Sequence, residues 1–448
     1  MKKGLSLVLS ALLAVSLLAG CGAAPAASDS PSSAAPESSS AAASSSAAES
    51  TSAEPEKPAV TSITLSHNKV EIDEPLKAYA AEYAKKSGVT VDIQTVGGGA
   101  DYGGNLKAQL QSGNFPDIFV IEGPSGYDLW KDKIADLNDQ PWIGDTDVAY
   151  KADGKVVGFP VAIEGYGMAY NKDLLAKAGI DPATLTSFDA YKAAFEKIDG
   201  MKADLGIDAV VAMAAGPEMT WVTGLHNFNV YLAGGLATTD TSVIDKVLAG
   251  EVDKDRLTQY AEYVNLLFQY ADKKVLLTGN YDAQANLFAS GKSVFIHQGN
   301  WLDPTLVTLG AAFDMAYAPH GFSKTATDGI FVAAPSWYIV NKDSKGINEA
   351  KAFLNSLATT EEGHRYMVEG AGMVPAFKSV KLSPKNPLSK SIMEWSAAGK
   401  TYAWQQYKLP DGFGMKTLGP IYEQLAAGKI DVPKFVELVT TEVAAIKK

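Results

Sequence analysis

The sequence predicts an α/β fold divided between two globular units. The chain has 448 residues, which is more than one hydrophobic core usually serves, because single cores stop growing near roughly 250–300 residues. Short apolar runs of strand length alternate with amphipathic stretches of helical period along most of the chain. This alternation is typical of mainly parallel sheets covered by helices.

Folded patterning begins at residue 63, and the elements follow in a regular order. Strands are expected at 63–66, 89–96, 117–121, 167–170, 210–214 and 293–297. Helices are expected at 75–86, 105–111, 188–198, 256–270 and 348–357, with a capping box at 359–362 opening the next. The β-α-β-α-β order over 63–121 predicts a parallel sheet whose ligand edge lies at the carboxyl ends of its strands.

The N-terminus has the features of an export signal. Lys2 and Lys3 precede an apolar run over residues 5–18, which is too short to span about 30 Å of hydrocarbon comfortably. Residues 1–20 are therefore interpreted as a lipoprotein signal peptide, because the junction before Cys21 resembles the bacterial lipoprotein box. Cys21 is the single cysteine of the chain. The alternative interpretation is that Cys21 is a buried cysteine beside an ordinary signal-peptide cleavage site. We expect lipidation of Cys21 to hold the protein on the extracytoplasmic face of the cell membrane.

Residues 21–60 differ in composition from the rest of the chain. They consist mainly of Ala, Ser, Pro and Glu and contain no aromatic residue. Such a segment cannot bury enough apolar surface to offset its ordering entropy. We expect a disordered tether between the anchor and the globular units.

The net charge of the chain and its content of arginine disfavour some classes of partner and ligand. The formal net charge is −12, so nucleic acid and anionic membrane surfaces are poor partners, and the expected membrane contact is the lipid anchor alone. Arg256 and Arg365 are the only arginines, which disfavours an anionic ligand, although lysines or helix N-termini could still supply such a site.

Several motifs together carry a family resemblance over about residues 61–448. They are Pro-Asp-Ile-Phe at 116–119, the segment 158–164, the segment 168–175, Phe-Ala-Ser-Gly-Lys at 288–292, and Gly-Asn-Trp at 299–301. Their order and spacing resemble the sugar-binding (family 1) extracellular solute-binding proteins of bacterial ABC importers, the group that includes maltose-binding protein.

This resemblance implies a two-lobed periplasmic-binding-protein-like fold with hinge strands and an interlobe ligand cleft that closes on its ligand. The first lobe is expected to comprise 61–164 with 320–377, and the second 165–319 with 378–448, with a hinge turn near 319–321. The implied function is capture of a sugar, preferably an oligosaccharide, and its delivery to ABC transporter permease subunits, without catalysis or cofactor.

Tryptophans are the first candidates for ligand contact, because sugars stack their apolar CH faces on aromatic rings. Trp301 follows Asn300 at the end of an apolar strand, and Trp221 lies in a turn-like stretch rich in polar groups. Trp337 and Trp404 are further candidates, for which a core position is the alternative.

Acidic and polar side chains at expected strand ends are the second set of candidates. Glu164 and Glu122 each end an apolar run, where a carboxylate is costly unless it meets water or a ligand. His67 ends the first strand, and Asp101 and Tyr102 follow a triple glycine. The structural alternatives are an ordinary buried histidine, a helix N-cap and a packing tyrosine.

Other functions stay open at this level. Glu122 and Glu164 could form the acid pair of a secreted carbohydrate-active enzyme, and a peptide or polyamine could replace the sugar. The triple glycine at 97–99 lacks the Lys-Ser/Thr of a phosphate loop and favours a flexible turn. Histidine spacing gives no indication of a metal site.

Overall fold

The computed structural model describes residues 60–447. The predicted signal peptide, the lipidation site Cys21 and all but the last residue of the tether lie outside this range. None of the described helices combines the length and apolar character that a membrane crossing needs.

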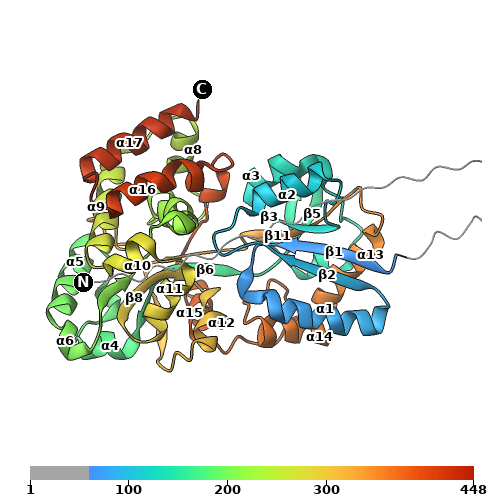
Figure 1. Ribbon diagram of the computed structural model, residues 1–448, viewed down its shortest axis with the longest axis horizontal. Coiled ribbons are helices and arrows are strands. Elements are labelled where there is room, and N and C mark those ends of the chain that lie inside the picture. The colour runs from blue at the N-terminus through green and yellow to red at the C-terminus, as the bar shows by residue number, and fades with distance from the viewer. Residues whose placement is uncertain (1–59, 448) are drawn as a thin grey trace, which may run out of the picture. The chain divides into compact units, whose positions relative to one another are not determined.

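The described chain contains two sheets (Figure 1). The first has the order β2-β1-β3-β11-β5-β4. Its strands are β1 (Ser62–His67), β2 (Thr90–Thr95), β3 (Ile118–Glu122), β4 (Tyr150–Ala152), β5 (Lys155–Pro160) and β11 (Ser336–Val340). Strands β1, β2 and β3 are parallel, as predicted, and β11 runs antiparallel to β3 and β5.

The second sheet has the order β12-β10-β6-β8-β7, with β9 also paired to β6. Its strands are β6 (Glu164–Asn171), β7 (Ala209–Ala212), β8 (Ser293–Gly299), β9 (Met315–Ala318), β10 (Ile330–Ala333) and β12 (Thr401–Tyr402). Every residue of β6, β7 and β8 is buried. The sequence of β7 is accordingly apolar throughout, whereas β6 and β8 also bury polar residues near their ends.

Helices accompany both sheets. Those that follow the strands of the first sheet are α1 (Asp73–Ser87), α2 (Tyr102–Gln111), α3 (Gly123–Trp130), α13 (Ile347–Thr359) and α14 (Glu361–Arg365). In Figure 1, α2 and α3 lie on one side of this sheet and α1 and α14 on the other.

The remaining helices contribute to the unit built around the second sheet. They are α4 (Lys172–Lys177), α5 (Phe188–Gly200), α6 (Lys202–Leu205), α7 (Phe228–Ala233), α8 (Ser242–Leu248), α9 (Lys254–Gln269), α10 (Lys273–Thr278), α11 (Tyr281–Ala289), α12 (Leu302–Thr308), α15 (Pro387–Ala397), α16 (Gly419–Ala426) and α17 (Val432–Ala445).

The alternation along β3 shows how the first sheet receives a core on each face. Ile118 and Val120 pack with α1 and α13, whereas Phe119 and Ile121 pack with Leu106 and other residues of α2 and α3. Successive strand side chains point to opposite faces, so a fully apolar strand is required where helices cover both. A separate, larger core surrounds the second sheet and extends to α17.

The chain passes between the sheets at residues 161–163, after β5, and returns at 334–335, before β11. It leaves the core of the first sheet again after Val380 and joins the second core at Leu388 of α15. The first passage lies next to the predicted crossing at Glu164. The predicted hinge turn at 319–321 was wrong, because Phe322 and Phe331 are buried in the second core and β10 pairs with β6.

The elements expected from periodicity are present with small shifts of their ends. Helix α2 begins three residues earlier than expected, because the Asp101 side chain accepts the Gly104 backbone N–H and caps it. The predicted cap at Thr359 was off by one residue: Thr360 accepts from Gly363, and the Thr359 hydroxyl instead donates to Asn355.

Candidate ligand-binding site

A cavity of about 560 Å³ lies at the carboxyl ends of β1, β2 and β3. These strand ends contribute Asn68 and Lys69, the glycine turn 97–99, and Glu122. The facing wall comes from the second core and the C-terminal segment, through Trp221, His226, Tyr281, Trp301 and residues 406–416. Parallel strand ends form the ligand edge in open α/β sheets, which matches the prediction from the sequence.

A buried ion pair lies where the chain first passes between the sheets. Lys69 Nζ and Glu164 Oε1 are 2.5 Å apart, and both side chains are about nine-tenths buried. Burial alone would lower the pKa of Lys69, but the carboxylate of Glu164 and its acidic neighbours outweigh that effect and raise it. Lys69 is therefore held as a cation that fixes the carboxylate of Glu164.

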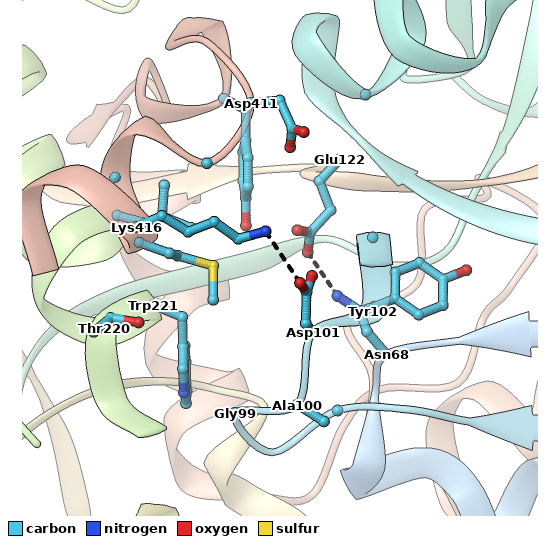
Figure 2. A pocket seen from close by; sticks show the side chains of 18 of the residues that line it. Asn68, Gly99, Ala100, Asp101, Tyr102, Glu122, Thr220, Trp221, Asp411 and Lys416 are labelled. Atoms are coloured by element: carbon cyan, nitrogen blue, oxygen red, sulfur yellow. Dashed lines mark hydrogen bonds and ion pairs between the residues drawn. The ribbon is translucent and has the colours of Figure 1, made fainter. Parts of the chain in front are cut away.

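Two further carboxylates border the same cavity. Asn68 Nδ2 donates to Glu122 Oε1 at 3.3 Å, a contact drawn in Figure 2. Burial raises the pKa of Glu122, with Lys69 opposing the rise. Burial also raises the pKa of Glu71 to about 7. With three carboxylates and one lysine, this end of the cavity offers mainly hydrogen-bond acceptors.

Aromatic rings form the opposite wall. Trp221 lies 6.3 Å from Trp301 and 6.1 Å from Tyr281, measured between ring centroids. The His226 ring lies 5.0 Å from that of Trp301, and burial lowers the pKa of His226 to about 3. A neutral imidazole therefore supports the indole, and both tryptophans remain half-buried at the cavity wall.

The orientation of Trp301 is fixed by a chain of hydrogen bonds. Its Nε1 donates to Gln298 at 2.8 Å, the Gln298 amide donates to Gln284, and the Gln284 amide donates to the Ala212 carbonyl of β7. The indole also folds back over Gly299, where a Cβ would lie 2.0 Å from the ring. A residue without a side chain is therefore required at position 299.

Two ion pairs span the outer part of the cavity. Lys416 Nζ lies 3.0 Å from Asp101 Oδ2, and Lys107 Nζ lies 3.0 Å from Asp411 Oδ2. Figure 2 draws the first of these pairs as a dashed line. Both pairs join α2 or its cap to the segment before α16, and all four side chains are substantially exposed. Exposed pairs of this kind contribute roughly 0–1 kcal/mol each.

This cavity combines rings for stacking with acceptors for hydroxyl groups, and it lies in a fold that known proteins share. Residues 78–393 match the model of the bacterial extracellular solute-binding protein family. The chain belongs to this family. The predicted resemblance is thereby confirmed.

Two relatives of this solute-binding protein have names that concern carbohydrates. The melibiose/raffinose/stachyose-binding protein MelE of Bacillus subtilis is 24% identical over 343 residues, covering 73% of this chain and 76% of MelE. A maltooligosaccharide ABC transporter solute-binding lipoprotein of Streptococcus pneumoniae is 36% identical over 136 residues, 28% of this chain and 31% of the relative.

Solved structures share its fold. A sugar transporter protein from Bacillus licheniformis in complex with stachyose superposes with a TM-score of 0.70 at 19% identity, covering 86% of this chain and 100% of the other. RafE in complex with raffinose gives a TM-score of 0.71 at 17% identity, with the same coverages. The predicted two-lobed α/β fold class is confirmed.

Six of the candidates from the sequence meet at the cavity of this solute-binding protein. They are Glu122, Glu164, Trp221, Trp301, Asp101 and Tyr102. Tyr102 contributes little polarity, because its hydroxyl already donates to the Ser66 carbonyl and accepts from Val120 N. Asp101 is both the cap of α2 and the partner of Lys416.

Four candidates do not line the main cavity. His67 is fully buried beside Thr95, and burial lowers its pKa to about 4. Trp337 donates from Nε1 to the Val148 carbonyl, and Trp404 packs against Tyr166 and other rings of the second core. Asn300 is buried; its Oδ1 accepts from Gly165 N, so it ties the loop after β8 to β6.

Several lining residues were not predicted. Lys69 and Glu71 follow β1 directly, and their position after a strand of the predicted parallel sheet was a signal that could have found them. Tyr281 and the segment 406–416 carry no such signal, because they reach the cavity only through the packing of the second core and the C-terminal helices.

Proposed function

We propose that this protein is a lipid-anchored extracytoplasmic solute-binding protein that captures a sugar, an oligosaccharide in preference to a monosaccharide, and delivers it to an ABC transporter permease. The observation that carries the proposal is the composition of the cavity. Aromatic rings line one wall, and the carboxylates of Glu122 and Glu164 line the opposite wall; the rings are those of Trp221, Trp301 and Tyr281. Aromatic rings accept the CH faces of pyranoses, and carboxylates accept hydrogen bonds from hydroxyl groups.

The relatives support the same class of ligand. MelE is named for melibiose, raffinose and stachyose, and two of the structural neighbours contain stachyose or raffinose. A cavity of about 560 Å³ is within the range of small-molecule sites. Galactose-containing oligosaccharides of the raffinose series are therefore the first ligands to test.

The anchor and the delivery step rest on the sequence and on family membership. Cys21 at the end of an export signal supplies the thiol for lipidation, and a relative from Streptococcus pneumoniae is named a lipoprotein. A tethered binding protein keeps its ligand close to the membrane permease that receives it.

The proposed lobes are residues 61–163 with 336–380, and 164–333 with 387–448. These limits follow the two cores and the three passages of the chain between them. The proposed contacts are Glu164, Glu122, Trp301, Trp221 and the polar groups of Asp101. Closure of the lobes over the ligand would bring both walls against it.

A thermal-shift panel tests this function. Raffinose, stachyose and maltotriose are compared with a tripeptide and spermidine, and stabilisation by at least one of the sugars is expected. Stabilisation by the peptide or spermidine alone would contradict the proposal. New reducing ends after incubation with the same sugars would instead favour an enzyme with Glu122 and Glu164 as its acid pair.

A further inference from the structure

Glu71 differs from the other carboxylates around the cavity. It lies in the short 3₁₀ helix η1 (Val70–Ile72), is half-buried, and borders both the main cavity and a smaller hollow of about 20 Å³ beside Trp301. Within residues 60–447, its side chain accepts only from the backbone N–H of Glu71 itself and has no ion-pair partner, whereas Glu164 pairs with Lys69 and Glu122 accepts from Asn68.

A carboxylate in this position is costly unless a donor reaches it. Partly removing an ionised group from water without replacing its hydrogen bonds carries a free-energy penalty. Lys69 Nζ forms its ion pair with Glu164, and no ion pair among the described residues joins it to Glu71. The acceptor positions of Glu71 that its own backbone N–H does not use therefore face the cavity, where a donor that enters can reach them.

The charged and titratable groups around Glu71 come from several elements. Lys69 precedes η1, Glu122 ends β3 and Glu164 begins β6. The other groups coupled to it are Tyr281 of α11, Tyr338 of β11 and Tyr366 of the π-helix η7 (Tyr366–Gly370). Burial raises the pKa of all three phenols, so they stay neutral near pH 7, where Glu71 itself titrates.

We propose that the Glu71 carboxylate accepts a hydrogen bond from a hydroxyl group of the bound sugar. Because burial raises the pKa of Glu71 to about 7, such a contact would also make sugar binding release a proton near neutral pH. This inference rests on the proposed function and adds a ligand-recognition residue and a pH dependence to it. The ligand class that fits is a neutral polyhydroxyl compound, which donates to the carboxylate without bringing a charge of its own.

The direction of the pH effect follows from the two states of Glu71. In the unliganded protein its pKa is about 7, so the side chain is mostly protonated at pH 6 and mostly ionised at pH 8. A hydroxyl donor favours the ionised form and lowers the pKa in the complex. Binding at pH 6 must therefore expel a proton, and the affinity should be about tenfold weaker there than at pH 8.

Calorimetric titration with raffinose and stachyose as probes, at pH 6 and pH 8 and in two buffers of different ionisation heat, measures both the affinity and the protons released. The parent protein should show the affinity change and the proton release. Glu71→Gln should bind more weakly at pH 8, with neither effect. Glu71→Asp should keep a pH dependence, because it keeps a carboxylate. Glu74→Gln is the matched control, since Glu74 lies three residues away with its side chain 86% exposed and outside the cavity.

The outcomes separate the two proposals. If the parent binds these sugars and Glu71→Gln retains the parent's affinity, pH profile and proton release, the role of Glu71 is refuted while the proposed function stands. Proton uptake on binding would likewise refute it. If the parent binds no sugar in the panel, the proposed function fails, and the role of Glu71 fails with it.

Discussion

Replacing Trp301 with Ala separates a ligand platform from a core residue. The indole is half-buried, rests on Gly299 and His226, and borders the cavity. If a pyranose ring stacks on it, the substitution removes about 80 Å² of apolar contact from the complex, which is worth roughly 2 kcal/mol at about 25 cal/mol per Å². That corresponds to about 30-fold weaker binding. Isothermal titration with the best sugar from the thermal-shift panel measures the loss.

Trp337→Ala is the matched control for this substitution. Trp337 packs against Tyr150 at 4.8 Å between ring centroids and does not line the cavity. It should lose up to about 3–5 kcal/mol of unfolding free energy, as large core truncations do, with sugar affinity unchanged. Denaturant unfolding of both unliganded variants completes the comparison. A Trp301→Ala protein that binds within about threefold of the parent but unfolds much earlier would refute the platform role.

Three further perturbations follow from the same structure. Lys69→Met leaves the buried Glu164 carboxylate without its counter-ion and should lower the free energy of unfolding by about 3–5 kcal/mol. Adding Glu164→Gln to this variant should restore part of the lost stability. An unchanged stability of Lys69→Met would contradict the buried ion pair between Lys69 and Glu164. Because the folded-state pKa of Glu71 is raised to about 7, its contribution to stability is present below its ordinary pKa and is lost as the pH rises through 7. Glu71→Gln should therefore raise the melting temperature of the unliganded protein more at pH 8 than at pH 5, and an equal shift at both would count against it. Cys21→Ser should leave the globular part folded but prevent lipid processing; persistent membrane fractionation together with uptake of labelled fatty acid would exclude Cys21 as the anchor.

The alternating order of strands and helices could be predicted from the sequence because its physical causes are local. The apolar run 117–121 lies in a strand with a core on both faces, and its carboxyl end leads directly to Glu122 at the cavity. Parallel pairing of β1, β2 and β3 then brings three strand ends together, and the candidate Glu122 at the end of β3 borders the cavity.

The positions of the other candidate side chains depend on tertiary packing, which the sequence pattern does not encode. Trp337 and Trp301 both lie at or near strands and looked alike in sequence, yet only Trp301 borders the cavity, because Gly299 lets its ring fold back. His67 ends a strand as Glu122 does, but its side chain is enclosed beside Thr95 and Asp73. The segment 406–416 reaches α2 across a distance in sequence that no local pattern encodes.

A crystal structure of the protein grown with raffinose tests the central claim most directly. The account predicts density for the sugar inside the cavity, with a pyranose ring against Trp301 or Trp221 and hydroxyl groups within hydrogen-bond distance of Glu122, Glu164 or Glu71. Sugar bound at another surface, or an empty cavity at a sugar concentration that saturates binding in solution, would contradict it.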